Sequence, residues 1–276
     1  MTAGSSLDLS IVIVSFNARA ELARCLASLA AAPPATSHEI LVVDNGSTDG
    51  SVDAARAAGV RVVEAGANVG FARGNNLGIR ASHGANLLLL NSDTVVARGA
   101  IDGLVARLQA PDAADVAVVG PRLVDAEGRA ELSFGRMLGP FAEWRQKRLV
   151  TGQARRDPRL SALVERMTRQ EQGVDWVSGA CLLVRRTDAE AVGLLDERFF
   201  MYTEDVDFCA AVRARGRRVL FTPSVEVVHL RGRSAASAPG ATERAYARSR
   251  LAFYEKHRPG WAPLLRLLLR MRGTDI

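Results

Sequence analysis

Residues 39–49 read EILVVDNGSTD, in which a short, mostly aliphatic run leads directly into a polar turn and a cluster of helix-capping residues. The run is typical of a buried strand, and the cluster after it is typical of a turn followed by a helix N-terminus. The same order occurs at residues 10–17, SIVIVSFN, and at residues 86–93, NLLLLNSD. Repeated strand–turn–helix units predict an α/β, Rossmann-like domain whose mostly parallel central sheet is flanked by helices on both faces.

Further elements follow outward from these runs. A helical period follows the first run, at Leu22, Cys25, Leu26 and Leu29. We expect additional strands at residues 61–64, 116–119, 176–185, 219–221 and 225–230. We expect helices after the capping residues 47–49 and at residues 71–81, 100–108 and 205–214.

The second half of the chain is less regular. Residues 132–173 are rich in Arg, Gln and Gly, which predicts loops and short helices, and we assign no chemistry to them. Small residues at 234–241 predict a linker, and a basic helical tail follows. We therefore expect one domain at residues 1–240 and a tail at residues 241–276. The domain divides into two halves, residues 1–120 and 121–240.

The composition narrows the class of protein. A chain of 276 residues with 48% hydrophobic content can bury the core of one large α/β domain. The formal charge of +6 favours an anionic partner such as a nucleotide, a nucleic acid or a lipid headgroup. Nucleic acid is the least favoured, because only 5% of the residues are aromatic and no basic–aromatic interleaving occurs.

The cysteines and the N-terminus bear on the compartment. Cys25, Cys181 and Cys209 are dispersed in apolar stretches without CxxC spacing, which favours core positions and a reducing compartment. The first residues, MTAGSSLDLS, show no basic segment followed by an apolar core, and no apolar run reaches membrane-spanning length. We expect a cytoplasmic protein.

Polar clusters end the three most apolar strands. They comprise Ser15, Phe16 and Asn17, then Asp44 and Asn45, and then Asn91, Ser92 and Asp93. One such cluster is ordinary turn chemistry, but three at the carboxyl edge of one parallel sheet predict a binding crevice. No GxGxxG follows the first strand, and no Walker A motif with its lysine is present, which disfavours dinucleotide oxidoreductases and P-loop NTPases.

An ordered set of motifs runs from about Ser10 to Ser234: SIVIVSFNAR, ILVVDNGSTDGS, NVGFARGNNLGI, LLLLNSD, WVSGACLLVRR, LLDERFFMYTEDVDF and VVHLRGRS. This succession resembles the inverting glycosyltransferases of family 2, which have the GT-A fold, and is most similar to their rhamnosyltransferase-like branch. The resemblance implies transfer of a sugar from a nucleoside diphosphate to an acceptor hydroxyl. It makes residues 1–120 the nucleotide-binding half of the domain and residues 121–240 the acceptor and catalytic half.

The resemblance implies a donor site built from the first motifs. Asp44 takes the place of the family residue that accepts a hydrogen bond from the N3–H of uracil or thymine; otherwise it serves only an Asx turn before a helix cap. The resemblance also gives donor binding to a segment at a helix N-terminus, which includes Asn68, Gly70, Arg73 and Asn75. Arg73 could instead face solvent. Arg231 and Arg233 are either diphosphate contacts or solvated basic residues.

Asn91-Ser92-Asp93 takes the place of the family's DxD motif, which implies a divalent cation, Mg²⁺ or Mn²⁺, that neutralises the diphosphate. The neutral Asn91 departs from that motif, so Asp93 carries the carboxylate. His229 matches a late family histidine that can reach the same metal, and it is otherwise a structural histidine at a strand end. Asp with His fits either cation, and Mn²⁺ tolerates imidazole better.

Residues 203–207, TEDVD, precede a predicted helix. Acidic residues and a threonine cap are common there for purely structural reasons. The resemblance implies that Asp205 is the base that deprotonates the acceptor, and that Glu204 binds the acceptor or tunes the base. It also puts Trp176, Ser178 and Gly179 beneath the sugar and acceptor, although a strand Trp is more often a core residue.

The tail, at residues 254–272, interleaves leucines with arginines and carries Trp261. It either lies in the interface of an anionic membrane or packs on the domain or a second subunit. Acceptors in the rhamnosyltransferase-like branch are often polyprenyl-linked saccharides, which favours the membrane.

Together these features predict an inverting, metal-assisted transferase with a dTDP- or UDP-sugar donor, our choice being dTDP-L-rhamnose. The acceptor is a saccharide, expected to be linked to polyprenyl diphosphate, in cell-envelope polysaccharide synthesis at the inner face of the membrane. Two alternatives remain: a sugar-phosphate nucleotidyltransferase, and a non-catalytic nucleotide-sugar-binding partner of polysaccharide assembly, suggested by Asn91.

Overall fold

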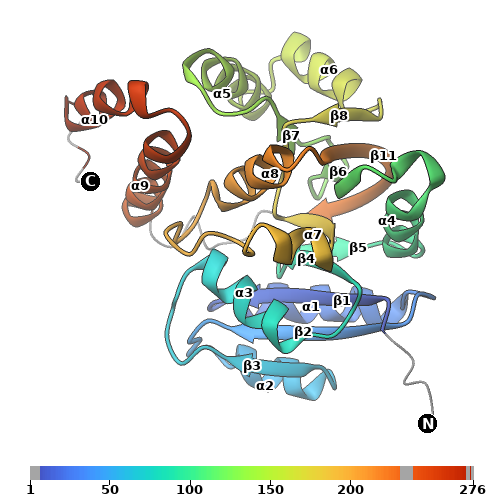
Figure 1. Ribbon diagram of the computed structural model, residues 1–276. Helices are drawn as coiled ribbons and strands as arrows, with labels where there is room; N and C mark the ends of the chain where they lie inside the picture. Colours follow the sequence, from blue (N-terminus) through green and yellow to red (C-terminus); the bar gives the residue numbers. More distant parts are fainter. Residues whose placement is uncertain (1–6, 231–238, 272–273, 275–276) are drawn as a thin grey trace.

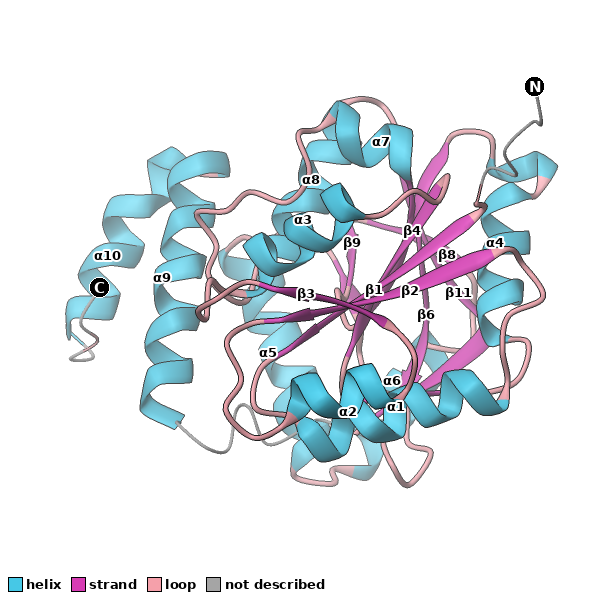
Figure 2. Cartoon of the chain, turned by 90° about the horizontal axis from the view of Figure 1, so that it is seen from below, coloured by secondary structure: helices cyan, strands magenta, loops and turns pink. Residues whose placement is uncertain are grey.

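The computed structural model of the chain describes residues 7–230, 239–271 and 274. Its centre is a nine-stranded sheet, flanked by helices on both faces (Figures 1 and 2). Four parallel strands make one half of the sheet: β3 (Arg61–Glu64), β2 (His38–Asp44), β1 (Leu9–Ser15) and β4 (Asn86–Asn91), in that spatial order. This half matches the predicted parallel sheet.

The other half of the sheet mixes directions. Strand β10 (Cys181–Arg185) runs antiparallel between β4 and β6 (Val116–Val124). Strand β11 (Arg218–His229) lies parallel to β6 and pairs antiparallel with β5 (Thr94–Val96) and β8 (Gln172–Val174). A separate small sheet joins β7 (Phe134–Gly135) to β9 (Trp176–Val177). The long strand β11 carries His229 back to the turn that follows β4.

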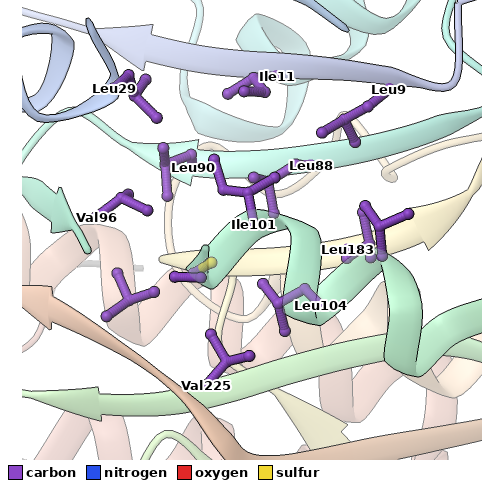
Figure 3. Close-up of a cluster of buried hydrophobic side chains, with 14 of the residues drawn as sticks. Leu9, Ile11, Leu29, Leu88, Leu90, Val96, Ile101, Leu104, Leu183 and Val225 are labelled. Atoms are coloured by element: carbon purple, nitrogen blue, oxygen red, sulfur yellow. The ribbon is translucent and has the colours of Figure 1, made fainter. Parts of the chain in front are cut away.

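Apolar side chains fill both faces of the central sheet. On one face, α1 (Arg19–Ala31), α2 (Ser51–Ala57) and α4 (Ala100–Gln109) cover a cluster that contains Ile11, Leu88 and Leu104 (Figure 3). On the other face, a second cluster lies under α3 (Phe71–Ala81), α5 (Pro140–Ala154), α6 (Pro158–Met167), α7 (Arg186–Ala191) and α8 (Glu204–Ala214). The three cysteines are buried, as the sequence predicts.

The C-terminal helices form a third cluster. Helix α9 (Pro239–His257) and α10 (Ala262–Met271) are joined by a short 3-10 turn, η2 (Pro259–Trp261), and a second 3-10 turn, η1 (Pro111–Ala113), follows α4. Phe253, Tyr254 and Leu265 pack there with Phe199 from the loop before α8. The helical tail is therefore present, and one of its faces packs on the domain. The predicted linker at residues 234–241 lies mostly outside the described residues.

Three element predictions differ from the structure. The single strand predicted at residues 176–185 is two strands, because the chain turns at residues 178–180 and leaves the small sheet for the central one. The two strands predicted at 219–221 and 225–230 are one strand, irregular between Thr222 and Glu226, where Pro223 cannot donate a ladder bond. The region predicted as loops and short helices contains α5, of 15 residues, as well as α6.

Candidate active site

The three polar clusters meet at one edge of the sheet. In the register of the parallel strands, Ser15 pairs with Asp44, and Val14 pairs with Asn91. The carboxyl ends of β1, β2 and β4 therefore lie side by side. Asn45 at the end of β2 donates its backbone N–H to the Ser15 carbonyl, 2.8 Å away, which fastens the two strand ends together. The predicted convergence of the clusters is confirmed.

Asp44 makes an Asx turn and keeps one oxygen free of it. Its Oδ2 accepts the N–H groups of Gly46 and Ser47, at 3.1 and 3.0 Å. Its Oδ1 is buried and accepts no hydrogen bond from the described residues, and neither does the buried hydroxyl of Ser15. A buried acceptor without a donor is costly unless a ligand supplies one. The structural role and a ligand-binding role of Asp44 are therefore compatible.

Asn45 holds the loop that precedes α3. Its amide donates to the Asn68 side chain at 3.0 Å and to the Gly70 carbonyl at 3.2 Å, and its Oδ1 accepts the Val69 N–H at 3.0 Å. Asn68 Oδ1 also accepts the Gly70 N–H, at 3.2 Å. Both asparagines, predicted to bind the donor, thus hold residues 68–70 against the end of β2.

Gly70 brings this loop against the segment before α8. It has a φ of +87°, and a Cβ there would lie 2.4 Å from the Phe200 carbonyl oxygen, which accepts the Phe71 N–H at 2.6 Å. On α3, the Asn75 amide donates to the Phe71 carbonyl at 2.9 Å, while its buried Oδ1 accepts from none of the described residues. Arg73 lies 3.8 Å from Glu197 and is 58% exposed, so it occupies a surface ion pair.

Phe16 and Asn17 form the outer rim beside β1. Phe16 is exposed, and Asn17 has a φ of +48°, a conformation that asparagine tolerates well. The Asn17 side chain accepts the Thr48 N–H at 2.8 Å, and its backbone N–H donates to the Ser47 hydroxyl at 2.9 Å. These bonds tie the loop after β1 to the turn after β2. Arg231 and Arg233 lie outside the described residues.

Asp93 and His229 face each other across the turn between β4 and β5. The His229 Nε2 lies 3.3 Å from Asp93 Oδ1, and its Nδ1 lies 3.1 Å from Glu131 Oε2. Burial opposes the charged ring, but the bonds to the two carboxylates outweigh it and raise the pKa of His229 to about 9. Within residues 7–230 and the described part of the tail, no three His, Cys, Asp or Glu side chains converge to hold a metal.

The donor set nevertheless suits a divalent cation bound together with a diphosphate. One carboxylate and one imidazole leave the remaining positions to phosphate oxygens and water, as is usual for such ions. Glu131 on the far ring nitrogen is the arrangement that fixes the orientation of a metal-bound histidine. Asn91 is positioned by its backbone, which donates to the Ala180 carbonyl at 2.9 Å, and Ser92 occupies the turn.

The acidic pair lies at the start of α8. Asp205 Oδ2 accepts the Gly179 N–H at 2.9 Å, and its Oδ1 accepts its neighbour's N–H, from Val206, at 2.8 Å. Burial raises the pKa of Asp205, and the two N–H groups oppose that rise. Glu204 is buried, its Oε2 accepts nothing from the described residues, and burial with the Asp205 charge raises its pKa well above the usual value.

The backbone before this pair is strained. Tyr202 and Thr203 have φ values of +69° and +71°, which are unusual for residues with a Cβ. Thr203 stands at the N-cap position, yet its side chain caps no backbone N–H, so the purely structural explanation of the motif is weakened. Such strain is held in place by its surroundings and is frequent at functional sites.

Strand β9 and the turn after it lie beside the acidic pair. Ser178 donates its N–H to the Ser133 carbonyl at 2.7 Å, and its hydroxyl accepts the Ala180 N–H at 3.2 Å. Trp176 is partly buried, packs against Gly135, and donates its indole N–H to the Arg136 carbonyl at 2.9 Å. A Cβ at Gly179 would lie 3.4 Å from Asp205 and from Phe71, which is ordinary van der Waals contact, so Gly179 lies directly beside the base candidate.

Two residues near the site were not predicted. Glu131 contacts His229 from a segment that precedes the irregular region, and no local pattern distinguishes it. Tyr246 comes from α9, where its ring meets that of Tyr202 edge-on at 5.9 Å. Partial burial, and the Glu143 and Asp205 carboxylates, raise the pKa of Tyr246. A long-range fold contact brings each to the site, so only the structure reveals them.

The family model described as glycosyl transferase family 2 matches residues 10–161. The chain belongs to glycosyltransferase family 2. A relative from Mycobacterium tuberculosis, an N-acetylglucosaminyl-diphospho-decaprenol L-rhamnosyltransferase, is 33% identical over 286 residues, which cover 93% of this chain and 87% of the relative. A low-salt glycan biosynthesis hexosyltransferase from Haloferax volcanii is 25% identical over 226 residues. That alignment covers 80% of this chain and 67% of the relative.

Solved structures agree with the family. A mannosyltransferase from Pyrobaculum calidifontis, in complex with GDP-Man and Mn²⁺, superposes with a TM-score of 0.62 at 17% identity, covering 94% of this chain and 68% of that one. GalNAc-T7 with UDP, GalNAc and Mn²⁺ gives 0.63 at 18% identity, covering 91% of this chain and 48% of that one. The protein is a family 2 glycosyltransferase with the GT-A fold.

Proposed function

We propose that this glycosyltransferase moves L-rhamnose from dTDP-L-rhamnose, with inversion, to a polyprenyl-diphosphate-linked saccharide during cell-envelope polysaccharide synthesis. The name of the mycobacterial relative, at 33% identity over 93% of this chain, supports both the sugar and the lipid-linked acceptor. The observation that carries the mechanism is the Asp205 carboxylate, held by the Gly179 N–H beside the strand ends. The geometry suits a base at a sugar-transfer site.

The nucleotide binds at the ends of β1 and β2. The free Oδ1 of Asp44 accepts the N3–H of thymine, while its Oδ2 stays in the turn. The Ser15 hydroxyl and the Asn75 Oδ1, both buried without a partner among the described residues, provide further polar contacts to the donor. Phe16, Asn17, Asn45, Asn68 and Gly70 shape this pocket, and Arg73 and Arg233 assist in donor binding.

Asp93 and His229 would hold the divalent cation, Mn²⁺ or Mg²⁺, and Asn91 and Ser92 stand in the same motif. When bound, the cation neutralises the negative charge of the departing dTDP. Glu131 accepts the Nδ1–H of His229, so that Nε2 points toward Asp93, 3.3 Å away. The chain's own residues thus supply an oriented oxygen and nitrogen donor, and the diphosphate supplies oxygens.

Asp205 is the base. Its carboxylate removes the proton from the acceptor hydroxyl, the oxygen forms a bond to the anomeric carbon, and the bond from that carbon to the diphosphate oxygen breaks on the opposite face. Glu204 holds its proton because burial and the Asp205 charge raise its pKa, which leaves the negative charge on Asp205. Glu204, Trp176, Ser178 and Gly179 line the acceptor and sugar side.

The tail contacts the inner face of the membrane that carries the acceptor. No helix in the described part of the chain combines the length and the apolar content needed to cross a bilayer. Helix α10 alternates arginine with exposed leucine, the composition of an interfacial helix. Attachment at the interface, without a helix that spans the bilayer, is therefore the form of membrane contact that we propose.

A panel of nucleotide sugars tests the proposal. Purified protein is incubated with dTDP-L-rhamnose, UDP-sugars or GDP-mannose, with Mn²⁺ or Mg²⁺, and with GlcNAc linked to a polyprenyl diphosphate. We expect rhamnose transfer from the dTDP donor, loss of transfer in EDTA, and recovery with added metal. Preferred turnover of another donor would refute the sugar assignment, and release of pyrophosphate would indicate a nucleotidyltransferase.

A further inference from the structure

Most of the large apolar side chains that are exposed among the described residues lie at one end of the molecule. They belong to α5, η2 and α10, namely Phe141, Trp144, Trp261, Leu264, Leu267, Leu268 and Met271. Water-exposed apolar patches of this kind usually mark a surface that contacts a partner or a membrane. The remaining ones, Phe16, Phe200 and Tyr246, belong to the rim of the active site described above.

Helix α10 is apolar on two sides. Ala262, Leu265 and Leu269 are buried in the cluster with α9. Leu264, Leu267, Leu268 and Met271 follow the spacing i, i+3, i+4 and i+7, so they form a second stripe, and they are 39 to 71% exposed. Packing in this cluster therefore accounts for one face of α10 only.

Helix α5 repeats this spacing on its own outer face. Phe141, Trp144, Arg145 and Arg148 again stand at i, i+3, i+4 and i+7, and all are exposed, Phe141 to 73%. The two rings stack with their centroids 5.8 Å apart, and the Arg148 guanidinium lies over the Trp144 ring. An aromatic pair followed by cations along one exposed face is typical of a helix at a lipid interface.

The segment before α5 and the first turn of α5 pack against the C-terminal helices. Met137 and Leu138, just before α5, pack in the same apolar cluster as Leu265 and Leu269 of α10. Glu143 of α5 is ion-paired to Arg250 of α9, which anchors the first turn of α5 to the C-terminal helices. Figure 1 shows α5 and α10 at the same end of the molecule, opposite α2 and β3.

The positive charge of this surface favours an anionic membrane over a second copy of the chain. Arg145, Lys147 and Arg148 are exposed on α5, whereas Glu143, the acid of its first turn, is only 12% exposed and faces α9. Arg270 is exposed on α10, and the exposed Arg266 there is ion-paired to Glu255 of α9. A two-fold dimer through this surface would bring cations against cations. Anionic lipid headgroups complement the cations, and the acyl region receives the apolar side chains.

We infer that α5 and α10 together form one surface that lies on an anionic bilayer, with Phe141 and Trp144 inserted beside the α10 stripe. This inference deepens the membrane contact of the proposed function by adding α5 as a second attachment. Two contacts fix the orientation of the molecule, whereas one helix alone fixes only its attachment.

Vesicle sedimentation tests the contribution of α5. Vesicles contain phosphatidylglycerol, or phosphatidylcholine alone for comparison, and the double variant Phe141→Ser/Trp144→Ser is compared with the wild type. We expect binding to phosphatidylglycerol vesicles to weaken by on the order of tenfold or more, because buried aromatic area is lost. The matched pair Arg24→Ala/Arg56→Ala, exposed on α1 and α2, leaves it unchanged.

Two further readouts separate the outcomes. The variant Trp144→Phe loses part of the blue shift in tryptophan emission on phosphatidylglycerol vesicles, and the double variant transfers sugar normally to a water-soluble acceptor. Wild-type vesicle binding by the double variant would overturn the inference, as would a wild-type dimer that this variant abolishes. Vesicle binding without any transfer would instead refute the proposed function and leave the inference standing.

Discussion

At the scale of single residues, Asp44 carries two roles on two oxygens. Its Oδ2 serves the turn, and its Oδ1 has no partner among the described residues. In Asp44→Asn the amide oxygen still accepts the hydrogen bonds of the turn. The NH₂ group then faces the N3–H of thymine, so two hydrogen-bond donors oppose each other. Calorimetry should show dTDP binding weaker by about 2 kcal/mol, or about thirtyfold, with folding unchanged.

The exposed carboxylate Asp53, on α2, is the matched control for this change. Asp53→Asn should bind dTDP as the wild type does. Equal dTDP affinities in Asp44→Asn and the wild type would remove Asp44 from the donor site.

Glu131 provides a second test at this scale, through its 3.1 Å contact with His229. Glu131→Ala leaves the imidazole without its acceptor, and Mn²⁺ affinity in the presence of dTDP should fall by roughly tenfold or more. Glu131→Gln keeps a carbonyl that accepts the Nδ1–H and should recover most of the affinity.

Free Mn²⁺ measured by electron paramagnetic resonance gives the readout for Glu131. Glu127→Ala, an exposed acid in the preceding turn, is the control. Unaltered Mn²⁺ affinity in Glu131→Ala, or a loss in Glu131→Gln as deep as in Glu131→Ala, contradicts the positioning role.

Glu204 links the site to pH. Its pKa in the folded state lies above its unfolded value, so its contribution to stability is full at low pH and is lost as pH rises through the folded pKa. Glu204→Gln cannot ionise, so its urea midpoint should fall less than that of the wild type between pH 5 and pH 8. If the urea midpoint of Glu204→Gln falls as steeply with pH as that of the wild type, Glu204 does not cause the pH dependence of stability.

Residue roles were predictable to different extents. Asp44, Asn91 and Asp93 stand directly after apolar runs, and strand direction alone brings them to one edge. Arg73 was ambiguous in sequence, and the structure puts it beside Glu197. Glu131 could not be predicted, because its meeting with His229 depends on the pairing of β6 with β11, about a hundred residues apart.

At the scale of elements, the loop before α3 depends on Gly70. A methyl group there would meet the Phe200 carbonyl at 2.4 Å, whereas Gly66, with a similar positive φ of +76°, has open space around it. Gly66→Ala should cost only the backbone strain, about 1 kcal/mol. Gly70→Ala should cost about 1 to 3 kcal/mol more, because backbone must move.

Urea denaturation of the two variants measures this difference. The donor loop also shifts in Gly70→Ala, so dTDP binding should weaken there and persist in Gly66→Ala. Equal losses of unfolding free energy in the two variants would show that the contact with Phe200 contributes nothing.

Strands and helices were easiest to predict where the apolar pattern of a run and the polar residues at its end indicated the same element. The strands at β1, β2 and β4 were confirmed, because each is a compact apolar run with a polar end. The break between β9 and β10 was missed, since the apolar pattern of residues 176–185 continues through it while the chain changes sheets. Short helices were predicted at residues 132–173, but the length of α5 was not, because much of α5 is exposed and its apolar residues do not all face the core.

At the scale of the whole molecule, the sequence predicted the α/β fold and the family, and the comparisons confirm both. For the tail, the sequence left two alternatives open: packing on protein, or contact with a membrane. The structure shows that one face of α10 packs and the other is exposed, so the first alternative is partly correct. The position of α9 beside the loop before α8 depends on long-range contacts such as that of the Ser249 hydroxyl with the Met201 carbonyl.

The central claim is that Asp205 removes the acceptor proton, and the rate of rhamnose transfer by Asp205→Asn tests it most directly. The variant keeps an oxygen for the Gly179 N–H, so dTDP binding should match that of the wild type. Without a base, transfer should be slower by on the order of a thousandfold at saturating substrates. Transfer by Asp205→Asn within about a factor of two of the wild type would show that Asp205 is not the base.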